Sequence, residues 1–176
     1  MKILLFILVP AILFVTTITE LYLKNSGLGN PVRYDSNIFY GYSPKENQKR
    51  ERFKGSYVTI NDVGLRSVDN WNNNNKKKIV FLGDSVTYGG SSIDDKDLFS
   101  HIVCKKLNEY LCGNAGVNSY GVYNTVMRSR FDKRIQNADF FIFLFPPDDF
   151  LRNFRGKDTA HFYLNNKNYL LPAITE

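Results

Sequence analysis

A short, unbroken apolar run that ends in a glycine constrains the fold of this chain more than any other feature. The run is Ile79 to Leu82, and Gly83, Asp84 and Ser85 follow it directly. β-Branched and aromatic residues without polar alternation are typical of a strand covered on both faces, as in a parallel sheet. A glycine permits the sharp turn that ends such a strand. Open α/β folds place their sites at the carboxyl edge of the sheet, so we predict a functional site at Ser85.

A second glycine-rich segment, Asn114 to Gly121, reads NAGVNSYG. Together with Gly83-Asp84-Ser85 it resembles the first two sequence blocks of the SGNH (GDSL-type) hydrolase family, of which the second has the form N-x-G-x-x-S-x-G. In that family the serine that matches Ser85 is the nucleophile. The glycine that matches Gly116 offers its backbone N–H to the oxyanion, and only a residue without a side chain lets an ester approach so closely.

This resemblance implies a fold and an activity. The fold would be a three-layer α/β/α, flavodoxin-like, doubly wound parallel sheet, here incomplete at its C-terminal end. The activity would be that of a serine esterase or acyltransferase, which needs neither cofactor nor metal ion. The substrate would carry an ester-linked acyl group, such as acetyl on a carbohydrate of an envelope glycan or polysaccharide. Whether water or a sugar hydroxyl accepts the acyl group stays open.

The family's third block, G-x-N-D, stands here as Pro146 to Asp149. The family's asparagine donates an N–H to the oxyanion, whereas an ionised Asp148 only accepts hydrogen bonds and would repel it. Three alternatives stay open. Asp148 is protonated, Asn153 or backbone amides replace it as the oxyanion donor, or the site is degenerate. Losing one oxyanion donor lowers the rate roughly 10²–10³-fold, so this change alone would weaken an enzyme without abolishing its activity.

A serine nucleophile also needs a base, normally a histidine that takes its proton. The family supplies this histidine from a D-x-x-H block that follows further βα units. Here the one D-x-x-H, from Asp158 to His161, follows the third predicted strand directly. Its spacing fits a catalytic pair, but its position favours a surface role. His101 is expected to pack or face solvent. A chain without a working base would be a non-catalytic SGNH-like module, and a flavodoxin-like domain whose Gly-Asp-Ser turn grips phosphate is a third interpretation.

The N-terminal segment predicts a membrane location. Residues 3–19 carry no charge, which is near the lower limit for a membrane span, and Pro10 is tolerated as a kink. Lys2 favours an N-terminus in the cytoplasm and the rest of the chain outside it, on the periplasmic or extracellular side. We favour an uncleaved anchor over residues 1–23. A cleaved signal peptide is the alternative, although no small-x-small cleavage site follows.

Charge and cysteine content add further limits. The net charge is +6, but the basic residues are scattered and accompany no nucleic-acid-binding motif. We therefore expect no nucleic-acid partner, while attraction to anionic polymers or lipid headgroups stays open. If both lay on one helix, Cys104 and Cys112 would be roughly 12 Å apart along its axis, which is too far for a disulfide. Because Cys112 is expected beyond the helix end, a disulfide stays open as well, and a metal site is not expected.

We divide the chain into the anchor, a stalk and N-terminal extension over residues 24–75, and a hydrolase-like domain over residues 76–176. The extension contains a segment from Asn61 to Arg66 that resembles the N-x-x-G-x-R stretch preceding the core in membrane-anchored members of the family. The predicted elements are a strand over 56–60, a helix over 97–111, a helix over 119–135 with Ser119 as N-cap, a buried strand over 138–145 and a hairpin over 161–171. The second helix is expected to pack on the sheet through Tyr123, Val126, Met127, Phe131 and Ile135.

Overall fold

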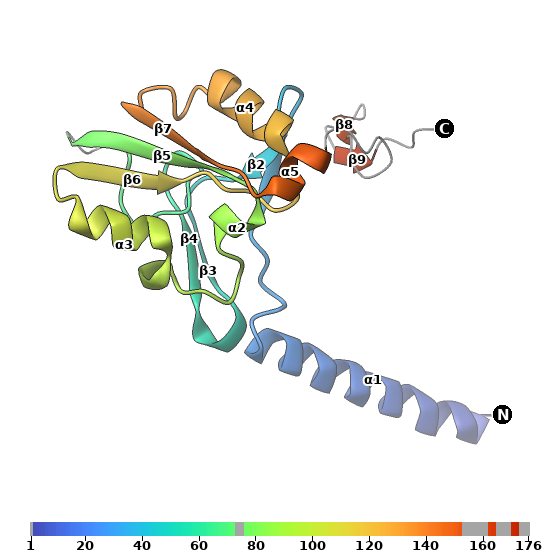
Figure 1. Ribbon diagram of the computed structural model, residues 1–176. Helices are drawn as coiled ribbons and strands as arrows, with labels where there is room; N and C mark the ends of the chain where they lie inside the picture. The colour runs from blue at the N-terminus through green and yellow to red at the C-terminus, as the bar shows by residue number, and fades with distance from the viewer. Residues whose placement is uncertain (1, 73–75, 153–161, 165–169, 173–176) are drawn as a thin grey trace.

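A computed structural model of the chain shows one long helix that leads into an α/β body (Figure 1). It describes residues 2–72, 76–152, 162–164 and 170–172. The helix, α1 (Lys2–Asn25), extends away from the body. Its segment Phe6–Asn25 is long and apolar enough to cross a membrane, and none of it is buried inside the structure.

The body is built around three parallel strands, β5 (Lys77–Gly83), β6 (Tyr110–Asn114) and β7 (Phe140–Leu144), in the order β6-β5-β7. Helix α3 (Phe99–Lys106) lies on one face of this sheet and α4 (Val122–Phe131) on the other. The predicted α/β class with a parallel sheet is therefore confirmed at this level.

The central strand β5 forms the middle of the core, as its apolar run predicts. Val80 and Leu82 are fully buried on one face, where Leu65 and Trp71 join them in one cluster. On the other face Phe81 packs edge-on against the ring of Phe99 in α3. Burying a large apolar side chain stabilises a fold by roughly 1.5–3 kcal/mol. Because β5 buries such side chains on both faces and pairs with both β6 and β7, the rest of the sheet depends on it.

Strand β6 was not predicted, because residues up to 111 were expected to be helical. The helix ends at Lys106, and a tight turn follows in which the Tyr110 N–H donates to the Leu107 carbonyl (2.9 Å). The strand YLCGN is short and contains glycine and asparagine, which strands disfavour, so its pattern does not reveal it. The turn brings Cys112 back beside Cys104, and the two form a disulfide with Cα atoms 5.7 Å apart.

One expectation about the α4 side of the sheet is wrong, and a second is confirmed only in part. Helix α4 begins at Val122 with Gly121 as N-cap, because Ser119 is exposed and takes a positive φ of 65°. The predicted apolar stripe forms only part of the packed face. Ile135 is fully buried in the core, but Tyr123 is 57 % exposed, whereas Arg128 is fully buried. The helix thus packs partly through a buried charge, which hydrophobic periodicity cannot detect.

Strand β7 was expected to be buried, and it is largely exposed. Phe140 is 49 % exposed, Ile142 37 % and Phe143 40 %. Within the described part of the chain, β5 is the only strand that pairs with it. Among the described residues, no strand covers its outer edge and only part of its side chains pack on the core, which explains why this apolar strand is accessible to solvent.

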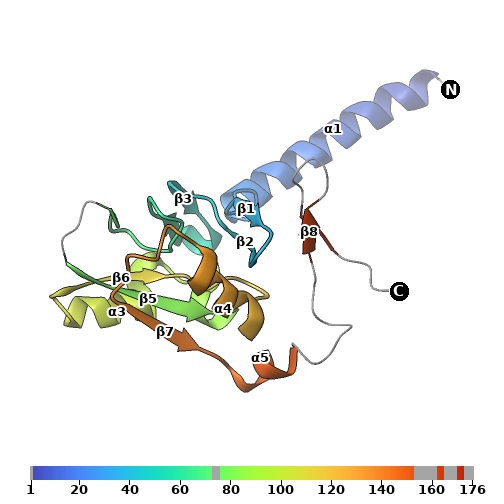
Figure 2. The ribbon, with the colours of Figure 1, turned by 90° about the horizontal axis from the view of Figure 1, so that it is seen from above.

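The predicted stalk is instead a folded part of the body (Figure 2). It forms two antiparallel hairpins, and Trp71 at its end is fully buried, with its indole N–H donating to Asn137 Oδ1 (2.8 Å). The hairpins comprise β1 (Tyr34–Asn37) with β2 (Gly41–Pro44), and β3 (Gln48–Glu51) with β4 (Tyr57–Ile60), the latter two joined by the 3₁₀ turn η1 (Phe53–Gly55).

Five short elements complete the description. The pairing of β8 with β9 confirms the predicted hairpin for the described residues on its two arms. The elements are α2 (Ser85–Tyr88), the 3₁₀ turn η2 (Asp95–Asp97), α5 (Pro147–Arg152), and the strands β8 (Phe162–Leu164) and β9 (Leu170–Pro172).

Candidate active site

Ser85 lies where the sequence predicts it, directly beyond the carboxyl end of β5. It is the first residue of α2, whose N-cap is Asp84. The Asp84 carboxylate is buried and accepts the Val86 N–H (2.9 Å), which fixes the turn that carries Ser85. Ser85 itself is partly exposed. Ser85 is thus held by a hydrogen-bonded turn at the sheet edge and remains partly accessible to solvent.

Glycine is required where the two sequence blocks meet. A Cβ at Gly83 would lie 2.1 Å from the hydroxyl oxygen of Thr87, and one at Gly116 would lie 2.3 Å from the backbone nitrogen of Tyr88. The Val117 N–H also donates to the Gly83 carbonyl (3.1 Å). The loop that follows β6 therefore packs directly on α2, so the structure brings the backbone around Gly116 against the turn that carries Ser85.

The amide proposed for oxyanion binding already has a partner. The Gly116 N–H donates to Asn114 Oδ1 (2.9 Å), and Asn114 Nδ2 donates to the Thr87 carbonyl (2.6 Å). Asn114 is buried and so ties the Gly116 loop to α2 from within. An oxyanion would therefore share the Gly116 N–H with Asn114. At the start of α2, the Ser85 N–H makes no hydrogen bond within the described part of the chain.

Arg66, from the N-terminal extension, holds both blocks in place. Its guanidinium is fully buried and donates to the carbonyls of Tyr88 (2.9 Å) and Gly90 (2.6 Å), at the end of α2. Its Nε donates to Asp95 Oδ1 (3.1 Å). Its backbone N–H donates to the Asn114 carbonyl (2.8 Å) and its carbonyl accepts from the Asn114 N–H (3.3 Å). One residue thus fixes the Ser85 helix and the end of β6 together.

A second buried arginine supports the Gly116 loop from the opposite side. Arg128 of α4 donates to the carbonyls of Ala115 (2.9 Å) and Gly64 (3.1 Å) and forms an ion pair with Asp132 (3.3 Å). Asp132 also accepts from Arg134 (2.8 Å). Burial alone would raise the pKa of Asp132, but the hydrogen bond from Arg134 and the charges of both arginines lower it below its usual value. The carboxylate stays charged and the clamp stays intact near neutral pH.

Sequence patterns pointed to only one of these two buried arginines. The N-x-x-G-x-R segment singled out Arg66, and the structure explains the spacing. Asn61 Oδ1 accepts the N–H groups of Val63 (3.2 Å) and Leu65 (3.0 Å), and Gly64 takes a φ of 75°. This tight turn directs Arg66 into the core. Arg128 was missed, because a lone arginine in a helix gives no signal of burial.

Asp148 lies at the same edge of the sheet as Ser85. Gly83 is the register partner of Leu144, the last residue of β7, and α5 follows after two residues. Asp148 is exposed in the first turn of α5, whereas its neighbour Asp149 is 1 % exposed. The block therefore presents the carboxylate of Asp148 to solvent at the site's edge and buries that of Asp149.

The structure does not place the predicted base. Asp158 and His161 lie outside the described residues. His101 lies on α3, where it borders a small recess together with Arg66, Asp95 and the Cys104–Cys112 disulfide. A larger recess of about 300 Å³ runs along β3 and β4 and is lined by residues of the extension, most of them polar but with Ile60 and Val68 among them. Neither of these two recesses includes Ser85.

Tyr88 closes α2 and is not a substitute base. Its ring is buried, and the Arg66 guanidinium lies 5.0 Å from the ring centre. Burial raises the pKa of the Tyr88 phenol above its ordinary value, and the charge of Arg66 only partly opposes this. The phenol therefore stays neutral near neutral pH and cannot take a proton from Ser85.

No protein-family model matches the chain, and a search of curated proteins finds no match either. The functional argument therefore depends on the residues and on their geometry.

Proposed function

We propose that this chain is a membrane-anchored serine hydrolase of the SGNH type that cleaves or transfers an ester-linked acyl group through Ser85. The observation that carries this proposal is the contact between two separate sequence blocks: the loop with Gly116 packs on the helix that Ser85 begins. A generic Gly-Asp-Ser turn would not need this second loop. The substrate class would be an acylated glycan of the envelope or a secreted polysaccharide.

In this mechanism the Ser85 hydroxyl attacks the ester carbonyl, and the backbone N–H groups of Ser85 and Gly116 stabilise the oxyanion. Asn114 would keep the Gly116 amide oriented until the oxyanion shares it. A histidine, with His161 and its partner Asp158 as the candidate pair, would take the serine proton and return it to the leaving group. Water or a sugar hydroxyl would then release the acyl group from Ser85.

We place the catalytic body outside the cytoplasm. Two features support this location: an N-terminal helix apolar enough to span a membrane, and the Cys104–Cys112 disulfide, since disulfides persist in oxidising compartments. Envelope glycans would then be within reach of Ser85.

The test is fluorophosphonate labelling of the full chain in detergent, beside Ser85→Ala, His161→Ala and Ser92→Ala as an exposed-serine control. We expect labelling of the parent and the control, and none of Ser85→Ala. Loss in His161→Ala as well would assign the base to that residue, whereas retained labelling there would indicate a different base. No labelling of a folded parent would overturn the catalytic proposal.

A second candidate is a non-catalytic module with the same fold, favoured by two observations: the Gly116 amide is engaged by Asn114, and an exposed carboxylate stands where an amide donor is expected. The substitution Asp148→Asn separates the two candidates. In a weakened enzyme it would restore an oxyanion donor and accelerate labelling by roughly 10²-fold or more. A non-catalytic module would remain unlabelled.

A further inference from the structure

The basic residues at the junction of α1 and the body take no part in the proposed chemistry. The segment from Lys24 to Tyr57 contains seven lysines and arginines against three acidic residues, and thus carries four of the chain's six net positive charges. If the body lies outside the cytoplasm, these charges flank the outer end of the span, opposite to the side on which basic residues normally gather. Their placement there indicates a negatively charged partner.

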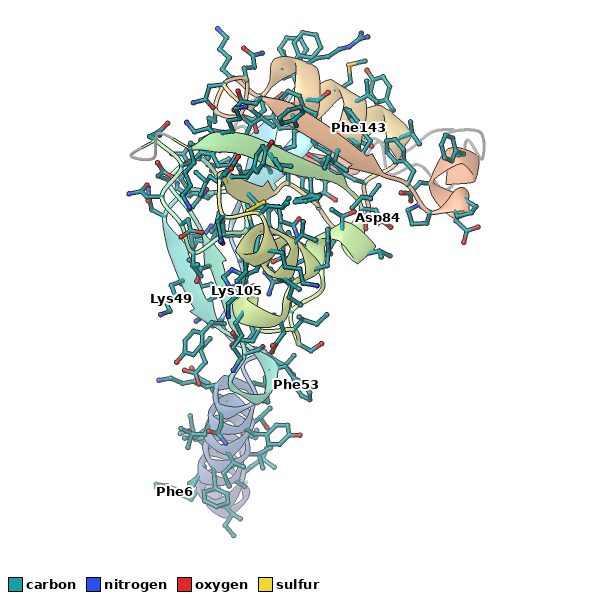
Figure 3. The ribbon with its side chains drawn as sticks, turned by 60° about the vertical axis from the view of Figure 1, so that its left-hand side comes forward. Phe6, Lys49, Phe53, Asp84, Lys105 and Phe143 are labelled. Atoms are coloured by element: carbon teal, nitrogen blue, oxygen red, sulfur yellow. A yellow bond between two sulfur atoms is a disulfide. The ribbon has the colours of Figure 1, made fainter. Side chains whose placement is uncertain are left out.

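The β3–β4 hairpin tip lies directly against the exit of α1. Gly27, two residues past the end of the helix, has a φ of 72°, and a Cβ there would lie 2.1 Å from the carbonyl carbon of Arg52. Figure 3 shows Phe53 at the end of the body that adjoins α1. If α1 spans the membrane, this contact holds the tip at the level of the lipid headgroups, because the apolar segment ends at Asn25.

Arg52 has an unusual environment at this tip. Its Nε and Nη1 are buried and have no hydrogen-bond partner among the described residues. Arg50, two residues earlier on β3, is satisfied by the side-chain oxygens of Asn30 (3.1 Å) and Gln48 (3.3 Å). Arg52 as a whole is partly exposed, but buried N–H groups of a guanidinium that lack an acceptor are costly. A phosphate presents the acceptor oxygens that match the planar guanidinium.

The surface around Arg52 suits a membrane interface. Phe53 and Tyr57 are each 39 % exposed, and Lys49 Nζ lies 4.9 Å from the centre of the Tyr57 ring. Aromatic rings and long basic side chains are the groups that collect at the headgroup level of bilayers. The acidic residue at this tip, Glu51, is exposed and makes no ion pair within the described part of the chain.

We propose that the β3–β4 tip and the exit of α1 form a binding site for the phosphate of an anionic phospholipid headgroup, with Arg52 as its principal ligand. The site would fix the tilt of the body over the bilayer. It would thereby set which way the Ser85 edge faces, since Asp84 lies well away from Phe53 in Figure 3. This inference depends on the proposed membrane anchoring and not on the proposed catalysis.

The test is hydrogen–deuterium exchange of the full chain in nanodiscs of phosphatidylcholine, with and without phosphatidylglycerol. Each engaged basic side chain near an anionic surface contributes a factor of about five. We therefore expect amides between residues 49 and 57 to exchange at least about fivefold more slowly with phosphatidylglycerol present, and Arg52→Gln to lose this protection. Arg130→Gln is the matched control, since Arg130 is exposed near the end of α4, away from α1 in Figure 1.

Several results would overturn the site. These are equal protection in both lipids, equal loss in Arg130→Gln, or equal protection by inorganic phosphate in phosphatidylcholine alone. Unchanged exchange in β5 excludes a folding defect in Arg52→Gln, and Arg52→Lys tests the guanidinium itself, because it keeps the charge but loses the planar fork. A chain that fails to enter nanodiscs would overturn the anchoring and this site together. Fluorophosphonate labelling of Ser85 is measured separately, so failure of the catalytic proposal can be distinguished from failure of this lipid site.

Discussion

The two edges of the parallel sheet differ in how they are finished. At the β6 edge, Arg66 bridges to Asn114 on one side and to Ile60 of β4 on the other, so the N-terminal extension continues the sheet. At the β7 edge, the described residues supply no further strand, and Phe140 and Phe143 are exposed. An exposed apolar edge is a template for pairing with another chain. The extension therefore protects one edge only.

This difference divides the candidate site as well. The Ser85 helix and the Gly116 loop are both anchored on the β6 side, through Arg66, Asn114 and Arg128. Asp148, by contrast, depends on β7 and is exposed. The part of the site that carries Asp148 is therefore less constrained than the part that carries Ser85 and Gly116. Four experiments would break or sharpen this contrast.

The largest effect is expected from Arg66→Ala. Removing this guanidinium leaves Asp95 buried without its ion-pair partner and frees two carbonyls at the end of α2. Breaking a buried ion pair costs about 3–5 kcal/mol. Urea unfolding followed by circular dichroism would measure the loss, and fluorophosphonate labelling of Ser85 should fall with it. A loss below about 1 kcal/mol would mean that the β6 edge does not depend on Arg66.

The second effect concerns the disulfide that joins α3 to β6. The loop between Cys104 and Cys112 is short, so its closure is expected to stabilise the fold by about 2–3 kcal/mol. We expect the double variant Cys104→Ser/Cys112→Ser to unfold at correspondingly lower urea concentration. Reductant should destabilise the parent by the same amount and leave the double variant unchanged. A parent insensitive to reductant would contradict this.

The third effect is smaller and confined to acid. The folded-state pKa of Asp132 is lowered relative to its unfolded value near 3.9. The stability it contributes is therefore fully present above about pH 4 and is lost as the pH falls through the folded-state pKa. Comparing urea midpoints of the parent and Asp132→Asn between about pH 6 and pH 2 should show a shallower decline in the variant. Parallel curves would show that Asp132 is not the source of the stability lost in acid.

The smallest effect on stability is expected at the β7 edge. Phe143 is the register partner of Leu82, but it is 40 % exposed whereas Leu82 is fully buried. We expect Phe143→Ser to change stability by about 0.5 kcal/mol and to reduce self-association measured by sedimentation. Leu82→Ala, its matched control in the core, should cost about 2–5 kcal/mol. Similar losses at both positions would show that the edge is covered in solution.

Sequence patterns predicted the parts of the fold that depend on local chemistry. The apolar run of β5, its glycine turn and the position of Ser85 follow from residue type alone. Strand β6 was missed because its glycine and asparagine lower strand propensity, and only pairing with β5 specifies it. The exposure of β7 could not be predicted either, since burial depends on which neighbours a strand finds. Arg128 escaped for the same reason: although its ion-pair partner Asp132 is nearby in sequence, the carbonyls that bury it, of Ala115 and Gly64, lie on other segments.

The single tryptophan of this chain is a built-in optical probe. Trp71 is fully buried where the N-terminal extension meets the sheet, and its indole N–H is bonded to Asn137. An indole in such surroundings emits at shorter wavelength than one in water, so detachment of the extension would shift the emission to the red. The state of the β6 edge can therefore be followed by intrinsic fluorescence in intact membranes, without any label.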